Sequence, residues 1–512
     1  MLPTFWARCP GLKTRNSRIL RELHQSTPRS RILLNNRAPQ ALSALRNVSH
    51  GVNILSSLRG QTRSLTGALA SKRVSFDPRF FSSNASVSLS AEHLSDAETS
   101  SHSTKPEELP TLTPPPVAMW LLASSALVFA VIVVGGVTRL TESGLSITEW
   151  KPITGILPPL GKADWEEAFE KYKATPEFKM INHSISLSDF KRIFYMEWGH
   201  RVLGRLIGLG FVIPLVYFAS RRVLPRSLAR NLTLYALLIG AQGALGWYMV
   251  KSGLEDALLE TPGAVPRVSQ YRLAAHLGTA FVLYAGMFST GISILTDWRW
   301  AKNGTWGGLK NTGSGAVWKV LETPSVRRFT RYSKLLTGLV FITALSGAFV
   351  AGLDAGLLYN EFPLMGGRIA PPSDELFSPL YAQKPDGSDI WWRNIFENPT
   401  TVQFNHRCLA ITTYFSTAAL FLASRRPALR AALPPLARKM ILSAFAMANI
   451  QVLLGISTLL YLVPVPLAAM HQAGSVMLLT TMVHLLVSLR RPGAAARLWR
   501  QAHLGSRKAA SS

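Results

Sequence analysis

The sequence predicts an all-α integral membrane protein. Its eight transmembrane helices are expected to form two tandem four-helix bundles, related by a pseudo-twofold axis along the membrane normal. Three observations lead to this prediction: eight apolar runs, an alternation of charge between the segments that join them, and an internal repeat. Charged residues make up only 16% of the 512 residues, whereas soluble domains carry about 25%. Most of the chain is therefore not expected to face water.

The formal net charge of +27 raises the question of nucleic-acid binding. Beyond the N-terminal region, however, most basic residues lie between long apolar runs, so we predict no nucleic-acid partner. The two cysteines, Cys9 and Cys408, are too few and too far apart for a disulfide framework or a cysteine metal site.

The N-terminal region has the composition of a targeting segment. Residues 1–73 contain 13 Lys and Arg against one acid, Glu22, and they lack the apolar core of a secretory signal. We interpret them as a mitochondrial transit peptide; a solvated basic tail is the alternative. Residues 74–116 are rich in serine, mildly acidic, and close on three prolines, which predicts a disordered linker.

Crossing a bilayer takes about 20 mostly apolar residues. Eight runs are long enough: 117–138, 199–220, 231–250, 271–295, 333–353, 402–423, 439–461 and 465–489. The segments after the even-numbered runs hold 23 Lys and Arg and two acids. The segments after the odd-numbered runs hold 13 Lys and Arg and 19 acids. Basic residues favour the side that is not translocated. Both termini should therefore lie in the matrix, and the loops 139–198 and 354–401 in the intermembrane space of a multi-pass inner-membrane protein.

The two halves match at a shift of roughly 200 residues. There are four matches in the same order along the chain. Gly144-Leu145 and Glu149-Trp150 correspond to Gly356-Leu357 and Glu361-Phe362, and residues 197–201 correspond to 403–407. Gln242 and Gly246 correspond to Gln451 and Gly455, and residues 274–276 correspond to 469–471. A four-span repeat begins and ends on the same side, so an axis along the membrane normal relates its copies. The expected domains are an N-terminal bundle (117–296), a matrix loop (297–332), a C-terminal bundle (333–489) and a basic matrix tail (490–512).

Four histidines lie near the starts of the even-numbered spans: His200, His276, His406 and His471; a fifth, His484, lies near the basic end of the last span. Each of the four comes one to six residues after the start of its span, so we expect all four at one depth, two in each bundle. Ionisable groups inside a membrane mark functional sites, and two imidazoles facing each other across a bundle suit haem iron. Interhelical hydrogen bonds and a proton relay are the alternatives; zinc would need a third protein ligand.

Small residues follow each histidine one turn later, which would leave room for a flat ring. They are Gly204, Ala280, Ala410 and Ser475.

The repeat changes at one chemically important position. Glu197 lies three residues before His200, whereas Gln403 occupies the matching place before His406. Glutamine has nearly the same shape but cannot exchange a proton at physiological pH. We predict that the N-terminal bundle is reactive and that the C-terminal bundle serves electron transfer or structure. A simple ion pair between Glu197 and Arg201 is the alternative.

Residues 135–152 read GGVTRLTESGLSITEWKP, and residues 194–201 read FYMEWGHR, followed by Gly204-Arg205. These motifs carry a resemblance to heme A synthase. It extends over about 117–489 and implies an oxidoreductase that oxidises the C8 methyl of haem O to a formyl group. The product, haem A, would serve cytochrome c oxidase.

The resemblance also implies the roles of the site residues. The substrate haem O or product haem A is expected between His200 and His276, and a resident haem b between His406 and His471, with Glu197 as the catalytic residue. Some bacterial relatives carry a cysteine pair in the first external loop, whereas residues 139–198 contain none. A thiol-dependent step through this loop is therefore not expected.

Two other functions stay open at this point. One is a diheme electron-transfer protein in which both haems are permanent, and the other is a transporter, because tandem repeats with ionisable residues also occur there. No nicotinamide, flavin or iron–sulfur motif is evident in the sequence, so electrons are expected from a separate protein, by resemblance a ferredoxin. Haem O synthase and the lipid bilayer are the other expected partners. The sequence is also compatible with a homo-oligomer.

Overall fold

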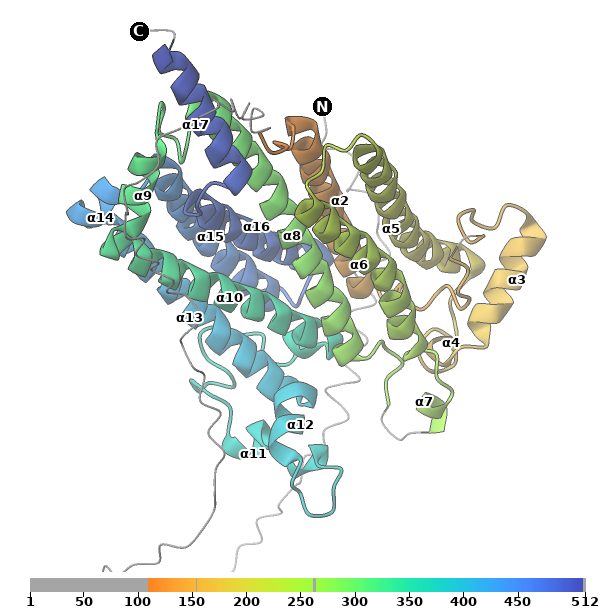
Figure 1. Cartoon of the computed structure of the whole chain (residues 1–512). Helices are drawn as coiled ribbons and strands as arrows, with labels where there is room; N and C mark the ends of the chain where they lie inside the picture. Colours follow the sequence, from red (N-terminus) through yellow and green to blue (C-terminus); the bar gives the residue numbers. More distant parts are fainter. Residues whose placement is uncertain (1–108, 153, 261–263, 510–512) are drawn as a thin grey trace, which may run out of the picture. The chain divides into compact units, whose positions relative to one another are not determined.

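The computed structural model describes residues 109–152, 154–260 and 264–509 (Figure 1). The regular elements of this part of the chain are all helices, and eight of them are long and apolar enough to cross a membrane. The predicted all-helical class and its eight spans are therefore confirmed. The predicted transit peptide, 1–73, and residues 74–108 of the predicted linker lie outside the described residues.

The eight long helices agree with the predicted runs. They are α2 (Pro115–Leu140), α5 (Leu187–Ser220), α6 (Arg226–Lys251), α8 (Gln270–Asn303), α10 (Pro324–Gly352), α13 (Pro399–Arg425), α15 (Pro435–Leu460) and α16 (Val465–Ser488). Proline stands in the first turn of α2, α10, α13, α15 and α16, where its missing N–H would have no helical partner anyway.

Helix α5 begins at Leu187, well before the predicted start near residue 199. The Ser186 hydroxyl caps it by accepting a hydrogen bond from the Asp189 N–H at 3.2 Å. The added turns bury Phe190 and Phe194 against Trp165 of α3 (Lys162–Lys173). These turns pack against a connecting segment rather than lipid, so a search for apolar runs does not detect them.

Each half of the chain forms a closed set of helix contacts. In the first half, α2 packs on α5 and α8, and α6 packs on the same two helices. In the second half, α10 packs on α13 and α16, and α15 packs on the same two helices. The halves meet through α2, α8, α10 and α16; Gln472 Nε2 donates to the Ile132 carbonyl at 3.1 Å, and the Tyr284 and Thr480 hydroxyls are 2.6 Å apart. The pseudo-twofold axis between the halves stays a prediction.

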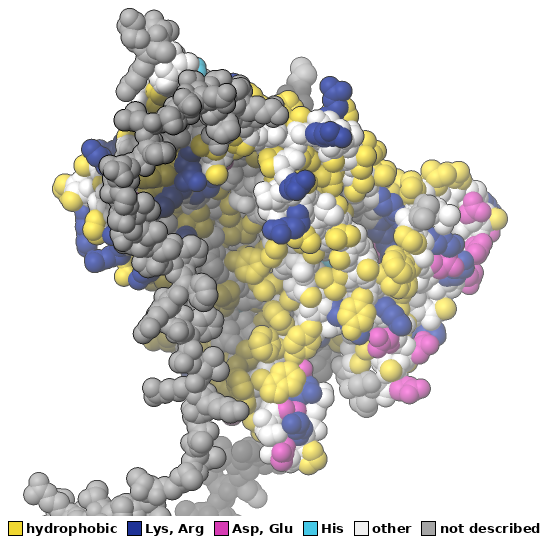
Figure 2. Space-filling view, in the orientation of Figure 1, with side chains coloured by type: hydrophobic (Ala, Val, Ile, Leu, Met, Phe, Trp, Pro, Cys, Tyr) yellow, Lys and Arg dark blue, Asp and Glu magenta, His cyan; other side chains and the backbone are white. Residues whose placement is uncertain are grey.

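Short helices lie at the two ends of the long ones (Figure 1). One end carries α9 (Ser314–Glu322), α14 (Pro427–Ala432) and α17 (Ala494–Ala509). The opposite end carries α3, α4 (Pro176–Met180), α7 (Ala257–Glu260), α11 (Ser373–Leu376) and α12 (Ile390–Glu397). On the face shown in Figure 2, the acidic side chains gather at this second end, and hydrophobic side chains dominate the region between the ends. The connecting segments thus separate by charge as the sequence predicts.

Candidate functional site

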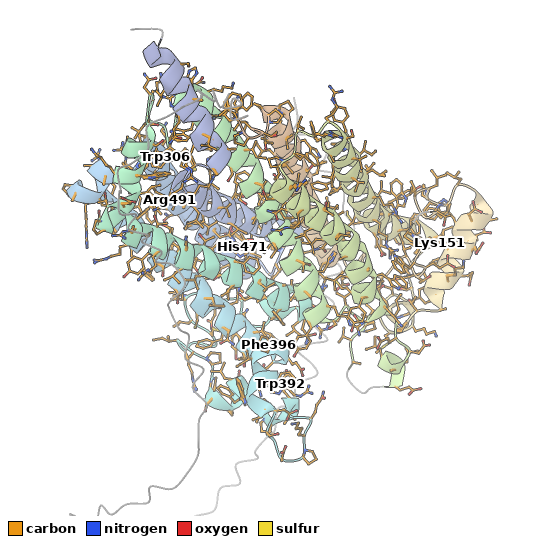
Figure 3. All side chains as sticks on the ribbon, in the orientation of Figure 1. Lys151, Trp306, Trp392, Phe396, His471 and Arg491 are labelled. Carbon is orange, nitrogen blue, oxygen red and sulfur yellow. The ribbon has the colours of Figure 1, made fainter. Side chains whose placement is uncertain are left out.

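The four predicted histidines lie on the four even-numbered spans and are all half-buried. The rings of His406 on α13 and His471 on α16 lie next to each other in a T-shaped arrangement, with centroids 6.5 Å apart and planes at 84°. Figure 3 shows His471 between the two ends of the helices, far from both Trp392 and Trp306. The structure therefore brings the second predicted pair together within the membrane-spanning region.

Every one of these imidazoles packs against a glycine of a neighbouring helix. A Cβ atom added to the glycine would lie 2.8–3.3 Å from the Cε1 atom of His200, His276 or His471, which is closer than an ordinary side-chain contact, and 3.5 Å from that of His406, which is an ordinary contact. The pairs are Gly135 with His200, Gly246 with His276, Gly347 with His406, and Gly455 with His471. A larger residue at Gly135, Gly246 or Gly455 would press on the imidazole, so these three glycines limit the positions of His200, His276 and His471. The sequence comparison singled out Gly246 and Gly455 but not the pair Gly135 and Gly347.

The repeated glutamines make equivalent contacts in both halves. Gln242 Nε2 of α6 donates to the His276 carbonyl at 3.3 Å, and Gln451 Nε2 of α15 donates to the His471 carbonyl at 2.8 Å. Each glutamine thus ties an odd-numbered span to the helix that carries the second histidine of a pair.

The second pair has the separation that one iron atom between two imidazoles requires. Two metal–nitrogen bonds of about 2 Å, with about 1 Å from each nitrogen to its ring centre, put the centroids about 6 Å apart. The observed 6.5 Å agrees with this value. In the first half, a Cβ on Gly204, one turn beyond His200, would meet nothing within 4 Å. The described residues therefore fit a flat cofactor that two histidine imidazoles hold, such as haem.

Glu197 is buried, at 3% exposure, and its carboxylate binds a connecting segment as well as its own helix. Oε1 accepts hydrogen bonds from Arg201 Nε and Nη2 at 3.0 and 2.6 Å. Oε2 accepts from the Ser146 hydroxyl at 2.7 Å and from the Ile147 N–H at 2.8 Å. The ion pair with Arg201 that the sequence left as an alternative is present. The contacts of Ser146 and Ile147 had no signal in the sequence.

Arg201 and Arg407, each directly after a histidine, bind the connecting segment that precedes their helix in the same way in both halves. Arg201 donates to the carbonyls of Ile147 and Glu149 at 3.0 and 3.2 Å. Arg407 donates to the carbonyls of Tyr359 and Leu364 at 2.8 and 3.0 Å. The repeat therefore extends from the spans into the segments that cover the histidine pairs.

A second buried acid, Glu177 of α4, lies outside the spans and near Glu197. Its side chain is 4% exposed, and its Oε2 atom has no hydrogen-bond partner. Burial, followed by the negative charges of Glu142 and Glu197, raises the pKa of the Glu177 carboxyl to about 8, against the opposing effect of the Tyr172 hydroxyl. Sequence reasoning missed Glu177 because it lies in a polar segment that resembles a solvated loop.

The family model COX15-CtaA, described as cytochrome oxidase assembly protein, matches residues 118–483, which include all eight spans almost completely. The chain belongs to this family. Among curated relatives, Heme A synthase COX15 of Saccharomyces cerevisiae is 46% identical over 378 residues, covering 74% of this chain and 76% of the relative. Heme A synthase COX15 of Homo sapiens is 44% identical over 375 residues, covering 73% and 83%.

One COX15-CtaA relative combines two proteins in its name. The heme A synthase-mitochondrial ferredoxin fusion protein of Schizosaccharomyces pombe is 48% identical over 370 residues, which cover 72% of this chain and 59% of the fusion. The family match confirms the resemblance that the motifs around residues 135–152 and 194–201 predict.

Proposed function

We propose that this chain is a heme A synthase of the mitochondrial inner membrane, with both termini in the matrix. In this proposal it oxidises the C8 methyl of haem O to a formyl group and so supplies haem A for cytochrome c oxidase. The observation that carries the proposal is the family match over 118–483, because this range contains the four histidines and Glu197. Relatives that are 44–46% identical and are named heme A synthase support the same reaction.

The proposal assigns one haem to each histidine pair. His200 and His276 would hold the substrate haem O and the product haem A, and His406 and His471 would hold a resident haem b. The 6.5 Å centroid separation of the second pair and the glycine behind each imidazole support this assignment. Haem supplies the iron and the redox chemistry when bound. The protein's contribution is to fix the imidazoles and to exclude water between the helices.

Glu197 is proposed as the acid/base group of the first pair. Its Oε1 atom is held twice by Arg201, so Oε2 is the atom that we assign to take up a proton. Ser146 allows this change, because its hydroxyl has a second acceptor, the Ile193 carbonyl at 3.3 Å. When Oε2 carries a proton, the Ser146 hydroxyl can turn to Ile193 and accept the hydrogen bond from the carboxyl group.

Electrons are proposed to come from a ferredoxin-type protein. The Schizosaccharomyces pombe relative, named as a fusion with mitochondrial ferredoxin, supports this donor. A haem O synthase is the proposed supplier of substrate, because the proposed reaction consumes haem O.

A diheme electron-transfer protein is the second candidate, and the equivalent glycine and glutamine contacts in the two halves favour it. Haem analysis of the purified protein, before and after incubation with haem O and with reductant, separates the two functions. The enzyme should hold one haem b per chain and an exchangeable haem O or haem A below one per chain. Two permanent haem b groups that haem O does not displace would contradict the proposed enzyme.

A further inference from the structure

One of the four imidazoles has a side-chain partner that the other three lack. The Nδ1 atom of His406 lies 2.7 Å from the Ser346 hydroxyl of α10. The Nδ1 atoms of His200, His276 and His471 are buried without a hydrogen-bond partner. Ser346 directly precedes Gly347, whereas the residue that directly precedes Gly135 in the first half is Val134. The repeat therefore supplies this hydroxyl to the second half only.

The hydrogen bonds around Ser346 fix the tautomer of His406. The Ser346 hydroxyl also lies 2.7 Å from the carbonyl oxygen of Thr343, one turn earlier on α10. A hydroxyl has a single proton, and a carbonyl oxygen can only accept. Both bonds form together only if Ser346 donates to Thr343 and accepts from an Nδ1–H group of His406. The neutral ring then presents an unprotonated Nε2 atom, which is the form that binds a metal ion.

We infer that Ser346 is a positioning residue that presets the ring of His406, which would hold the resident haem permanently. The inference rests on the proposed assignment of haem b to His406 and His471. A hydrogen bond from the second ring nitrogen fixes ring orientation and raises the basicity of the ligating nitrogen. It therefore strengthens the bond to iron and stabilises the ferric state. The unpartnered imidazoles of the first pair lack this support, as suits a haem that must leave after reaction.

Three variants of the full-length protein test the inference. Ser346→Ala removes the acceptor, and Ser346→Thr restores a hydroxyl at the same position. Ser424→Ala is the matched control, because Ser424 lies at the far end of the helix that carries His406 and its hydroxyl donates to the Phe421 carbonyl on that same helix at 2.6 Å. The readouts are the loss of haem b to excess apomyoglobin and the midpoint potential of the retained haem. Neither readout depends on the formation of haem A.

Ser346→Ala should weaken haem b retention by roughly 10–100-fold, the usual effect of losing such a partner. Its midpoint potential should become more positive, Ser346→Thr should restore both values, and Ser424→Ala should change neither. An unchanged potential and retention in Ser346→Ala, or an equal loss in Ser346→Thr, would overturn the inference. His406→Ala is measured alongside: if it keeps haem b, the proposed haem assignment itself is wrong. If it loses haem b while Ser346→Ala is normal, only the role of Ser346 is wrong.

Discussion

Glu197 and Gln403 occupy the same position in the repeat, but only Glu197 is bonded to the arginine that follows its histidine. Arg201 donates to the Glu197 carboxylate at 2.6 Å as well as to backbone carbonyls, whereas Arg407 donates to carbonyls alone. Gln403 makes one long contact, from Nε2 to the Tyr359 carbonyl at 3.4 Å, and its Oε1 atom has no partner. The two halves thus share the hydrogen bonds from the arginine to backbone carbonyls and differ in the carboxylate of Glu197.

Substitution of Glu197 by glutamine should separate chemistry from folding. Glu197→Gln copies a side chain that the second half already accommodates, so the protein should fold and keep haem b. Formation of haem A should fall by about 10²–10⁴-fold, as expected for losing a general acid or base. Haem O or a hydroxylated intermediate should accumulate, as measured by chromatography of extracted haems.

The matched control for this variant is Glu166→Gln. Glu166 is an exposed acid of α3, and its ion pair with Lys162 is weak because the two charged atoms are 3.7 Å apart. It should leave haem A formation unchanged. Near-normal haem A from well-folded Glu197→Gln would show a purely structural role, and attention would move to Glu142 and Glu149 in the same segment.

Ser146 should affect the proton-transfer step without affecting the resident haem. Ser146→Ala removes one donor to Glu197 Oε2 but leaves the bonds from Ile147 and Arg201. The rate should fall by less than in Glu197→Gln, and its pH profile should shift because the environment of the carboxyl changes. Steady-state rates between pH 6 and 9 measure this effect. A pH profile identical to the parent protein would show that Ser146 plays no part in proton transfer.

Glu177 should make the local stability of its segment depend on pH. Its pKa in the folded protein is about 8, above the usual 4.5, so the folded state binds the proton more tightly than the unfolded state. Its contribution to stability is therefore complete below about pH 4.5 and is lost as the pH rises toward 8. Hydrogen exchange of residues 162–182, corrected for the intrinsic rate, should show more frequent opening across this range.

In Glu177→Gln the same segment should open equally often at pH 5 and pH 8, because no titrating group remains at this position. A pH dependence that persists in Glu177→Gln would assign the effect to another group, such as Glu142.

Protease treatment of mitoplasts tests the orientation. The segments 139–198 and 354–401 should be cut from the outside, and a tag after Ser512 should survive. The physical reason is the charge asymmetry, since the segments after the even-numbered runs hold 23 basic residues and two acids. Loss of the tag with both segments protected would reverse the topology.

Sequence reasoning located the spans because apolar length is a local property of the chain. It found His406 and His471 because the repeat marks equivalent positions, and the structure brings their rings together. It could not find the roles of Ser346 and Ser146, because each acts through contacts with residues distant in sequence, and it missed Glu177 because the polar segment around this acid resembles a solvated loop. The early start of α5 was missed for a related reason, namely that Phe190 and Phe194 pack on α3 rather than on lipid.

The most direct test of the account is the haem content of purified histidine variants, identified by mass spectrometry. His406→Ala and His471→Ala should lose haem b and unfold at lower temperature, because a bound cofactor stabilises the folded state. His200→Ala and His276→Ala should keep one haem b per chain and contain no haem A. If all four variants lose the same single haem, the chain has one haem site and the assignment of separate reactive and resident halves is wrong.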